Sequence, residues 1–236
     1  MNPIFIVARK EALQILHNRQ TLLSAVLIAV VFGGVTIPAM LASGPGPSVP
    51  GIAGRTLGVY VVLLVGVFLG YLFAGQAFLR EKQEGTIETL LCSPLSLRQI
   101  WLGKVLGVTA PAYGITIAVA TMIIAGTGIL SGATVVPDAP VLGYILLVVP
   151  VVVAAAVGLL GFVQLLLGMR ENQIINMVVI FGLVFSVGIA QELAGPSFSV
   201  TWTVVGVLFA GSIALLLGTS FLSRFLDRER IVLTLP

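Results

Sequence analysis

Long apolar runs, separated by short polar stretches, cover most of the chain. A helix that crosses a membrane needs about 20 mostly apolar residues. The stretches that meet this requirement are about 21–42, 57–79, 105–130, 141–168, 174–190 and 200–222. The pattern predicts an all-α polytopic membrane protein with six transmembrane helices, folded as a single transmembrane domain over residues 1–236. Pro150 is a candidate kink site in the fourth span, because proline removes a helical hydrogen bond.

Composition supports a membrane protein and argues against several other classes. Of the 236 residues, 58% are hydrophobic and 9% are charged, whereas soluble domains carry about 25% charged residues. The net charge of +3, without a basic run that contains aromatics, gives no sign of a nucleic-acid partner. Cys92 is the only cysteine and His17 the only histidine. An intrachain disulfide is therefore excluded, and we expect no metal site built from His and Cys ligands.

The first 20 residues predict an amphipathic helix on the inner membrane surface. Asn2 and Pro3 fit an N-cap followed by proline at the first helical position. An apolar stripe and a polar face follow. The stripe is formed by Phe5, Ala8, Ala12 and Ile15, with Leu16 beside it, and the polar and charged residues include Arg9, Lys10, Glu11, Gln14 and His17. The helix is either a simple membrane anchor or also a contact for a cytoplasmic partner.

The next apolar run begins at Thr21 and is longer than the apolar region of a secretory signal peptide, which has about 7–15 residues. We therefore expect it to be a retained span. Basic residues orient the spans, since cytoplasmic loops carry an excess of Lys and Arg. Six spans leave only Arg55 outside and place both termini in the cytoplasm. The residues expected inside are Arg9, Lys10, Arg19, Arg80, Lys82, Arg98, Lys104, Arg170, Arg224, Arg228 and Arg230.

The loop at residues 80–104 is the largest hydrophilic feature on the cytoplasmic side. Gly85 and Thr86 can start a short helix with Glu88 in its first turn, where the helix dipole favours an acid. Pro94 ends that helix. The loop predicts a short helix beneath the membrane, shaped for docking to another protein.

A second helix is predicted to follow and to lead into the third span. Ser96 with Gln99 fits a capping box at its start. We expect the long side chain of Lys104 to reach the membrane interface from this helix.

The loop sequence resembles the signature of ABC-2-type transporter permeases. That signature joins acidic residues, Glu-Gly-Thr-x-Glu-x-Leu-Leu, Ser-Pro, and Gly-Lys at the next span. The residues that carry it here are Glu84, Gly85, Thr86, Glu88, Leu90, Leu91, Ser93, Pro94, Gly103 and Lys104. Segments 8–11, 18–19 and 225–230 also resemble the family's interfacial helix and C-terminal end.

The resemblance implies the permease subunit of an ATP-driven exporter in the cytoplasmic membrane. In such exporters a coupling helix after the second span sits in a cleft of a separate ABC ATPase subunit, and two permease chains pair as a homodimer or heterodimer. The matching coupling positions here are Glu81, Glu84, Gly85, Thr86, Glu88, Leu91 and Pro94. The chain has no G-x-x-x-x-G-K-[ST] phosphate loop. We therefore expect no enzyme activity and no cofactor in this chain, with ATP and Mg bound by the partner subunit.

The predicted spans contain essentially no charged residues, which argues against a proton-relay pump because such pumps need buried ionisable groups. Polar side chains in the spans are candidates for lining a transport pathway or for interhelical hydrogen bonds. They are Tyr60, Tyr71, Gln76, Tyr113, Gln164 and Asn176. Gly66, Gly70 and Ala74 form a ridge of small residues that suits helix packing or a dimer interface.

Two other functions stay open at this stage. One is an ATPase-coupled component of a cofactor or metalloenzyme maturation system, similar to haem exporters. The other is an ATP-independent carrier. The sequence identifies no cargo for any of the three.

Overall fold

A computed structural model describes residues 3–42, 52–81, 96–131, 136–166 and 200–222, together with Val178, Phe181 and Gly182. All regular secondary structure in these ranges is helical. The elements are α1 (Pro3–His17), α2 (Arg19–Ala42), α3 (Ile52–Ala74), the π-helical turn η1 (Gly75–Arg80), α6 (Leu97–Ser131), α7 (Ala139–Gly143), the π-helical turn η2 (Tyr144–Val148), α8 (Val149–Leu166) and α10 (Trp202–Leu222).

Within the described residues, five helical stretches are long and apolar enough to cross a membrane. They are Arg19–Leu41, Leu57–Arg80, Leu97–Ser131, Ala139–Leu166 and Trp202–Leu222. These stretches match five of the predicted spans to within a few residues, and the third also includes the helix that was predicted to lead into that span from Ser96. The predicted span at 174–190 lies outside the described residues apart from the three helical residues named above, so the count of six stays a prediction.

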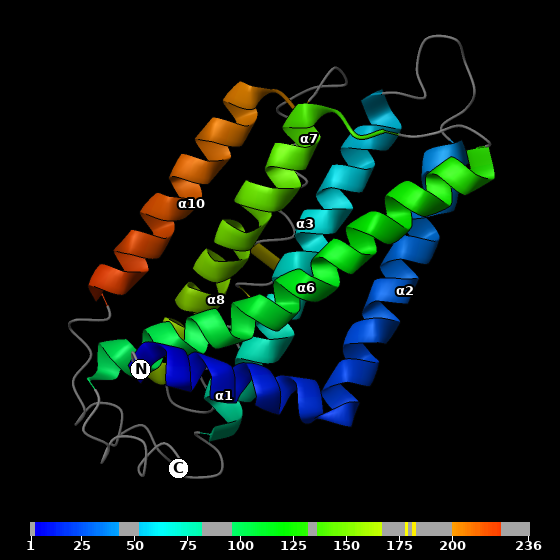
Figure 1. Cartoon of the computed structure of the whole chain (residues 1–236). Coiled ribbons are helices and arrows are strands. Elements are labelled where there is room, and N and C mark those ends of the chain that lie inside the picture. Colours follow the sequence, from blue (N-terminus) through cyan, green and yellow to red (C-terminus); the bar gives the residue numbers. More distant parts are fainter. Residues whose placement is uncertain are drawn as a thin grey trace.

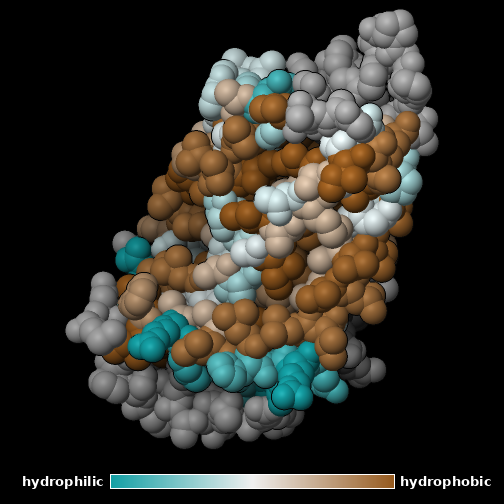
Figure 2. Space-filling view, turned by 45° about the vertical axis from the view of Figure 1, so that its right-hand side comes forward, coloured by the Kyte–Doolittle hydropathy of each residue, from teal (hydrophilic) through white to brown (hydrophobic). Residues whose placement is uncertain are grey.

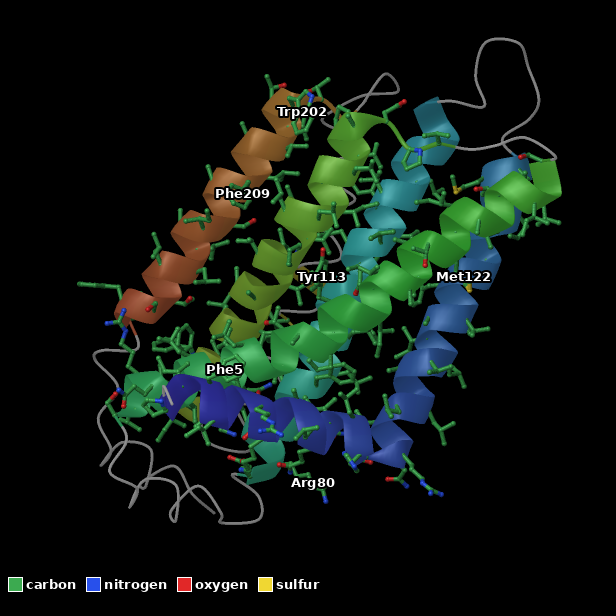
Figure 3. The ribbon with its side chains drawn as sticks, in the orientation of Figure 1. Phe5, Arg80, Tyr113, Met122, Trp202 and Phe209 are labelled. Carbon is green, nitrogen blue, oxygen red and sulfur yellow. The ribbon has the colours of Figure 1, made fainter. Side chains whose placement is uncertain are left out.

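The spans form a tilted bundle with α6 crossing its front (Figure 1). α3, α8 and α10 lie side by side, and α6 contacts α1, α2, α3 and α8. α1 does not run with the spans but lies across one end of the bundle, which we call the basal end. Phe5 and Arg80 lie at the basal end, and Trp202 lies at the opposite end (Figure 3). Hydrophobic residues cover most of the visible surface, and hydrophilic ones gather mainly along its lower edge (Figure 2).

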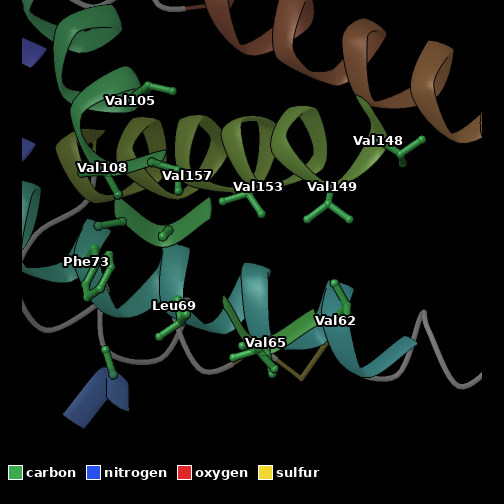
Figure 4. Packing of buried hydrophobic residues seen from close by; sticks show 14 of the residues in the cluster. Val62, Val65, Leu69, Phe73, Val105, Val108, Val148, Val149, Val153 and Val157 are labelled. Atoms are coloured by element: carbon green, nitrogen blue, oxygen red, sulfur yellow. The ribbon is translucent and has the colours of Figure 1, made fainter. Parts of the chain in front are cut away.

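The core forms where α3 packs against α8. The predicted ridge of small residues faces this contact, since a Cβ on Gly66 or Gly70 would lie 3.0 Å from a methyl group of Val153 or Val157, respectively. Valines and larger apolar side chains fill the space around it (Figure 4). The ridge therefore serves packing within the chain, as small residues do where helix backbones approach closely in lipid. α8 covers it, which leaves it unavailable as a dimer interface.

The fourth span is one continuous helix that changes from π-helical to α-helical hydrogen bonding beside Pro150, the candidate kink site. The π-helical turn η2 ends directly before α8, and Pro150 is the second residue of α8. Proline has no N–H to donate. The residue at position 150 would otherwise donate to the carbonyl of Ile145 in a π-helix or of Leu146 in an α-helix, so these two carbonyls lack that donor. The Tyr113 hydroxyl of α6 donates to both, at 3.2 and 3.4 Å. Tyr113, a predicted polar residue of the spans, thus makes an interhelical hydrogen bond.

α6 starts where the sequence predicts a helix to start. It is also longer than an upright helix needs to be to cross the apolar core of a bilayer. The Gln99 backbone N–H donates to Ser96 Oγ at 3.3 Å, and the Ser96 N–H donates to Gln99 Oε1 at 3.1 Å. This reciprocal pair confirms the predicted capping box. The helix has 35 residues, which at 1.5 Å per residue gives a length of about 52 Å. An apolar bilayer core is about 30 Å thick, so α6 is longer than an untilted span requires.

Candidate functional site

The predicted coupling loop is described only at its two ends. Glu81 follows η1, and Ser96 precedes α6. The other proposed coupling residues lie outside the described residues; they are Glu84, Gly85, Thr86, Glu88, Leu91 and Pro94. The structure therefore shows what holds the loop's ends rather than the loop itself.

Lys104 of α6 joins these ends to α1 through a buried ion cluster. Its Nζ donates hydrogen bonds to Ala77 O at 2.7 Å and to Glu11 Oε1 at 3.2 Å. It also forms an ion pair with Glu81 Oε2 at 2.7 Å. The Nζ lies 5.4 Å from the centre of the Phe78 ring, within range of a cation–π interaction. One ammonium group thus contacts α1, η1 and the residue at which the loop begins.

The cluster is almost closed to solvent. The side chains of Lys104 and Glu11 are each 3% exposed, and that of Glu81 is 9% exposed. The expectation that Lys104 reaches the membrane interface is wrong, because two carboxylates and a carbonyl hold its ammonium group inside the protein. Lys10 adds a second cation 3.5 Å from a carboxylate oxygen of each acid. The cluster of two lysines and two glutamates is therefore neutral, as burial of charge requires.

α1 reaches the cluster because α6 carries glycine where the two helices meet. A Cβ on Gly107 would lie 2.6 Å from Ala8 O and 2.7 Å from Glu11 Cβ. A Cβ on Gly103 would lie 2.7 Å from Val7 Cβ. Real Cβ contacts essentially never come below 3.0 Å. Glycine at both positions lets the backbones approach closely enough for Glu11 to meet Lys104.

The face of α1 that packs against α6 differs from the predicted stripe. Val7, Ala8, Glu11 and Ile15 lie on the packed side, whereas Phe5 is 64% exposed. The prediction placed Phe5 on the apolar stripe and treated Glu11 as part of the interfacial surface. This prediction is corrected because Glu11, which pairs with Lys104, lies in the contact between α1 and α6. Arg9 and Lys10 lie outside it, and both are exposed.

A second polar contact fixes the bend between α1 and α2. The Asn18 side chain caps α2, with its Oδ1 accepting from the Thr21 N–H at 3.5 Å. Gln76 of η1 accepts from Thr21 Oγ1 at 2.7 Å and from Asn18 Nδ2 at 3.3 Å. Gln76, a candidate pathway residue in the sequence, is therefore held at the bend. A transport role for it stays a prediction.

The remaining candidate pathway residues that the structure describes belong to α3 and α8. Gln164 of α8 is 1% exposed. Tyr60 and Tyr71 of α3 are partly buried, with the Tyr71 ring 6.4 Å from the Phe68 ring. Asn176 lies outside the described residues.

The ion cluster holds three segments together, namely α1, η1 and α6. η1 ends where the loop begins, α6 starts where it ends, and α1 lies across both. The sequence held one signal of this arrangement. Glu11 falls three residues after Ala8 and four before Ile15, which is the spacing of a single helix face. An acid on an apolar face needs a buried cation, and Lys104 supplies it.

The sequence of the chain matches a family model and two curated relatives. The sequence model of the ABC-2 family transporter protein matches residues 5–225. The chain is 32% identical over 142 residues to a probable ABC transporter permease protein NosY of Pseudomonas aeruginosa. It is also 32% identical over 140 residues to a protein of the same description from Stutzerimonas stutzeri. Each match covers 58% of this chain and 48% of the relative, so the chain spans about half the length of the curated relatives it matches. Because the family model covers nearly all of the chain, this multi-pass membrane protein belongs to the ABC-2 family of transporter proteins.

Proposed function

We propose that this chain is the membrane-spanning permease subunit of an ATP-driven exporter, powered by ATP that a separate ABC ATPase subunit hydrolyses. Family membership supports a transport subunit, and both relatives are described as ABC transporter permeases. Membership also favours the ATP-driven exporter over an ATP-independent carrier. The cargo stays open, since neither relative's description names one.

The observation that carries the proposal is the Lys104 ion cluster. A motor acting on residues 82–95 would push on a segment whose two ends are fixed to each other through Glu81 and Lys104. Glu11 extends the same connection to α1. Coupling between distant sites travels through packed elements and ion-pair networks. Movement of the loop would therefore be transmitted to η1, α6 and α1 together.

The orientation of the chain is part of the proposal. The described basic residues Arg9, Lys10, Arg19, Arg80 and Arg98 belong to elements that meet at the basal end. Because cytoplasmic loops carry an excess of Lys and Arg, these residues support an orientation with the basal end inside the cell. With six spans, both termini lie in the cytoplasm. A second permease chain would complete the transport pathway.

The native cysteine tests this orientation without any substitution. Cys92 is the only cysteine of the chain and belongs to the proposed coupling loop. A membrane-impermeant maleimide is expected to label it in inside-out vesicles and not in intact cells. Labelling in detergent provides the control for reactivity. Labelling of intact cells would place the loop outside, where no cytosolic ATPase could reach it.

A charge reversal in the loop tests the coupling. Glu84→Arg is expected to leave membrane insertion intact and to abolish both transport and capture of the proposed ATPase subunit. The reason is that the new cation would occupy a surface proposed to meet the partner with negative charge. Co-purification and transport-coupled ATP hydrolysis in proteoliposomes measure the two effects.

Arg98→Glu provides a matched control at the same end of the bundle. Its guanidinium group donates to Ser220 Oγ of α10 at 3.3 Å and does not join the ion cluster. It should leave ATPase capture largely unchanged. Wild-type capture and hydrolysis in Glu84→Arg would refute the assignment of the loop.

A further inference from the structure

Within the part of the chain that the structure describes, the outward face of α1 packs against no other helix, and it carries large apolar side chains beside charged ones. One side of α1 packs against α6 through Val7, Ala8 and Glu11. Large apolar side chains lie exposed on the rest of the helix: Phe5 (64%), Ile6 (53%), Leu13 (44%) and Leu16 (46%). The helix lies across the spans near the level where the surface changes from hydrophobic to hydrophilic (Figures 1 and 2). This is the position of a helix that rests in a membrane interface.

The exposed charges of α1 are all positive, because its one acidic residue is buried. Glu11 is the only acid between Pro3 and His17, and it is 2% exposed beside Lys104. Arg9 and, just past the bend, Arg19 are exposed, and neither forms an ion pair within the described part of the chain. Because the ion cluster buries Glu11, α1 has no exposed acidic side chain that would offset its positive charges.

We propose that this face of α1 binds the phosphate groups of anionic phospholipids in the inner leaflet. Arg9 and Arg19 contact the phosphates, and Phe5 and Leu13 enter the boundary between head groups and acyl chains. A lipid surface fits better than an acidic protein, because exposed apolar residues flank the arginines on a helix at interfacial depth. The leaflet depends on the orientation proposed above, whereas the lipid preference depends on neither ATP nor a partner subunit.

Fluorescence quenching in nanodiscs tests the proposal on the full chain. Phe5→Trp places an indole on the face, and the parent chain gives the background from Trp101 and Trp202. Brominated phosphatidylglycerol and brominated phosphatidylcholine are compared at equal mole fraction. Each arginine is expected to enrich the anionic lipid near the face by about fivefold, the factor that corresponds to its attraction to an anionic surface. Quenching should therefore be stronger with the anionic lipid.

Removing the two charges should abolish the preference. In Phe5→Trp with Arg9→Gln and Arg19→Gln, the two lipids are expected to quench equally. Arg98→Gln, which removes a cation from α6 at the same end, should keep the preference. Equal quenching before the arginines are removed, or a preference that survives their removal, would overturn the proposal.

A second arm separates lipid from protein as the occupant. Adding the ATPase subunit should leave quenching of the Phe5→Trp indole unchanged. Loss of quenching by both lipids on that addition would show a protein-docking face and refute lipid binding. Because the lipid measurements need no ATP turnover, their failure would leave the coupling tests of the exporter proposal unaffected.

Discussion

Replacing Lys104 with methionine is expected to lower the free energy of unfolding by about 3–5 kcal/mol, the cost of breaking a buried ion pair by removing one partner. The substitution keeps an unbranched side chain but removes the buried cation that the two carboxylates share. The cation that stays 3.5 Å from each acid, Lys10, has a side chain that is 55% exposed. Glu11 would be almost completely buried without the ammonium group that now lies 3.2 Å away. Denaturation of the purified chain in mixed micelles, followed by helical circular dichroism, measures the loss.

A neutral triple variant separates stability from mechanism. Lys104→Met with Glu11→Gln and Glu81→Gln removes the charges together, so no buried charge stays uncompensated. Its stability should return most of the way to that of the wild type, since neutral replacements of a buried ion cluster are often tolerated. If the cluster transmits force, this variant should still hydrolyse ATP with its partner but transport less cargo per ATP. A stable triple variant with wild-type transport per ATP would show that the cluster only supports the fold.

Replacing Gly107 with leucine is expected to displace α1 from α6. A Cβ at this position would meet Ala8 O at 2.6 Å, and a backbone carbonyl cannot turn aside as a side chain can. Overpacking costs about 1–3 kcal/mol, so the α1 amides should exchange hydrogen about 5- to 150-fold faster. Hydrogen-exchange mass spectrometry of a peptide that covers α1 measures this change.

Gly114→Leu provides the matched control for that substitution. Gly114 lies on the same helix, and a Cβ there would have nothing within 4 Å in the described residues. The exchange of α1 should stay at its wild-type rate in this variant. Equal exchange of α1 in both variants would contradict the close approach of α1 to α6.

Both experiments address the same physical connection. The glycines set the distance between α1 and α6, and the ion cluster uses that distance to join Glu11 to Lys104. If α1 moves away, the acid leaves its cation, and the face proposed to bind lipid loses its purely positive charge. Packing, charge burial and surface chemistry at the basal end therefore depend on one another.

The features that the sequence determined by itself are local ones. Five spans followed from the length of their apolar runs, because the bilayer sets the length that a span must have. The Ser96–Gln99 capping box and the altered hydrogen bonding beside Pro150 also depend on neighbouring residues. Proline removes a hydrogen bond whatever surrounds it, and a capping box needs only its own four positions.

The features that only the tertiary structure decided join residues far apart in the chain. Glu11 and Lys104 are 93 positions apart, and no periodicity in the sequence relates them. The local sequence pattern predicted Lys104 at the membrane interface and Glu11 on the interfacial helix, since hydropathy treats each charge as exposed. Their burial depends on two helix backbones meeting at Gly103 and Gly107. The close approach of those backbones, and not either residue alone, brings Glu11 and Lys104 together inside the protein.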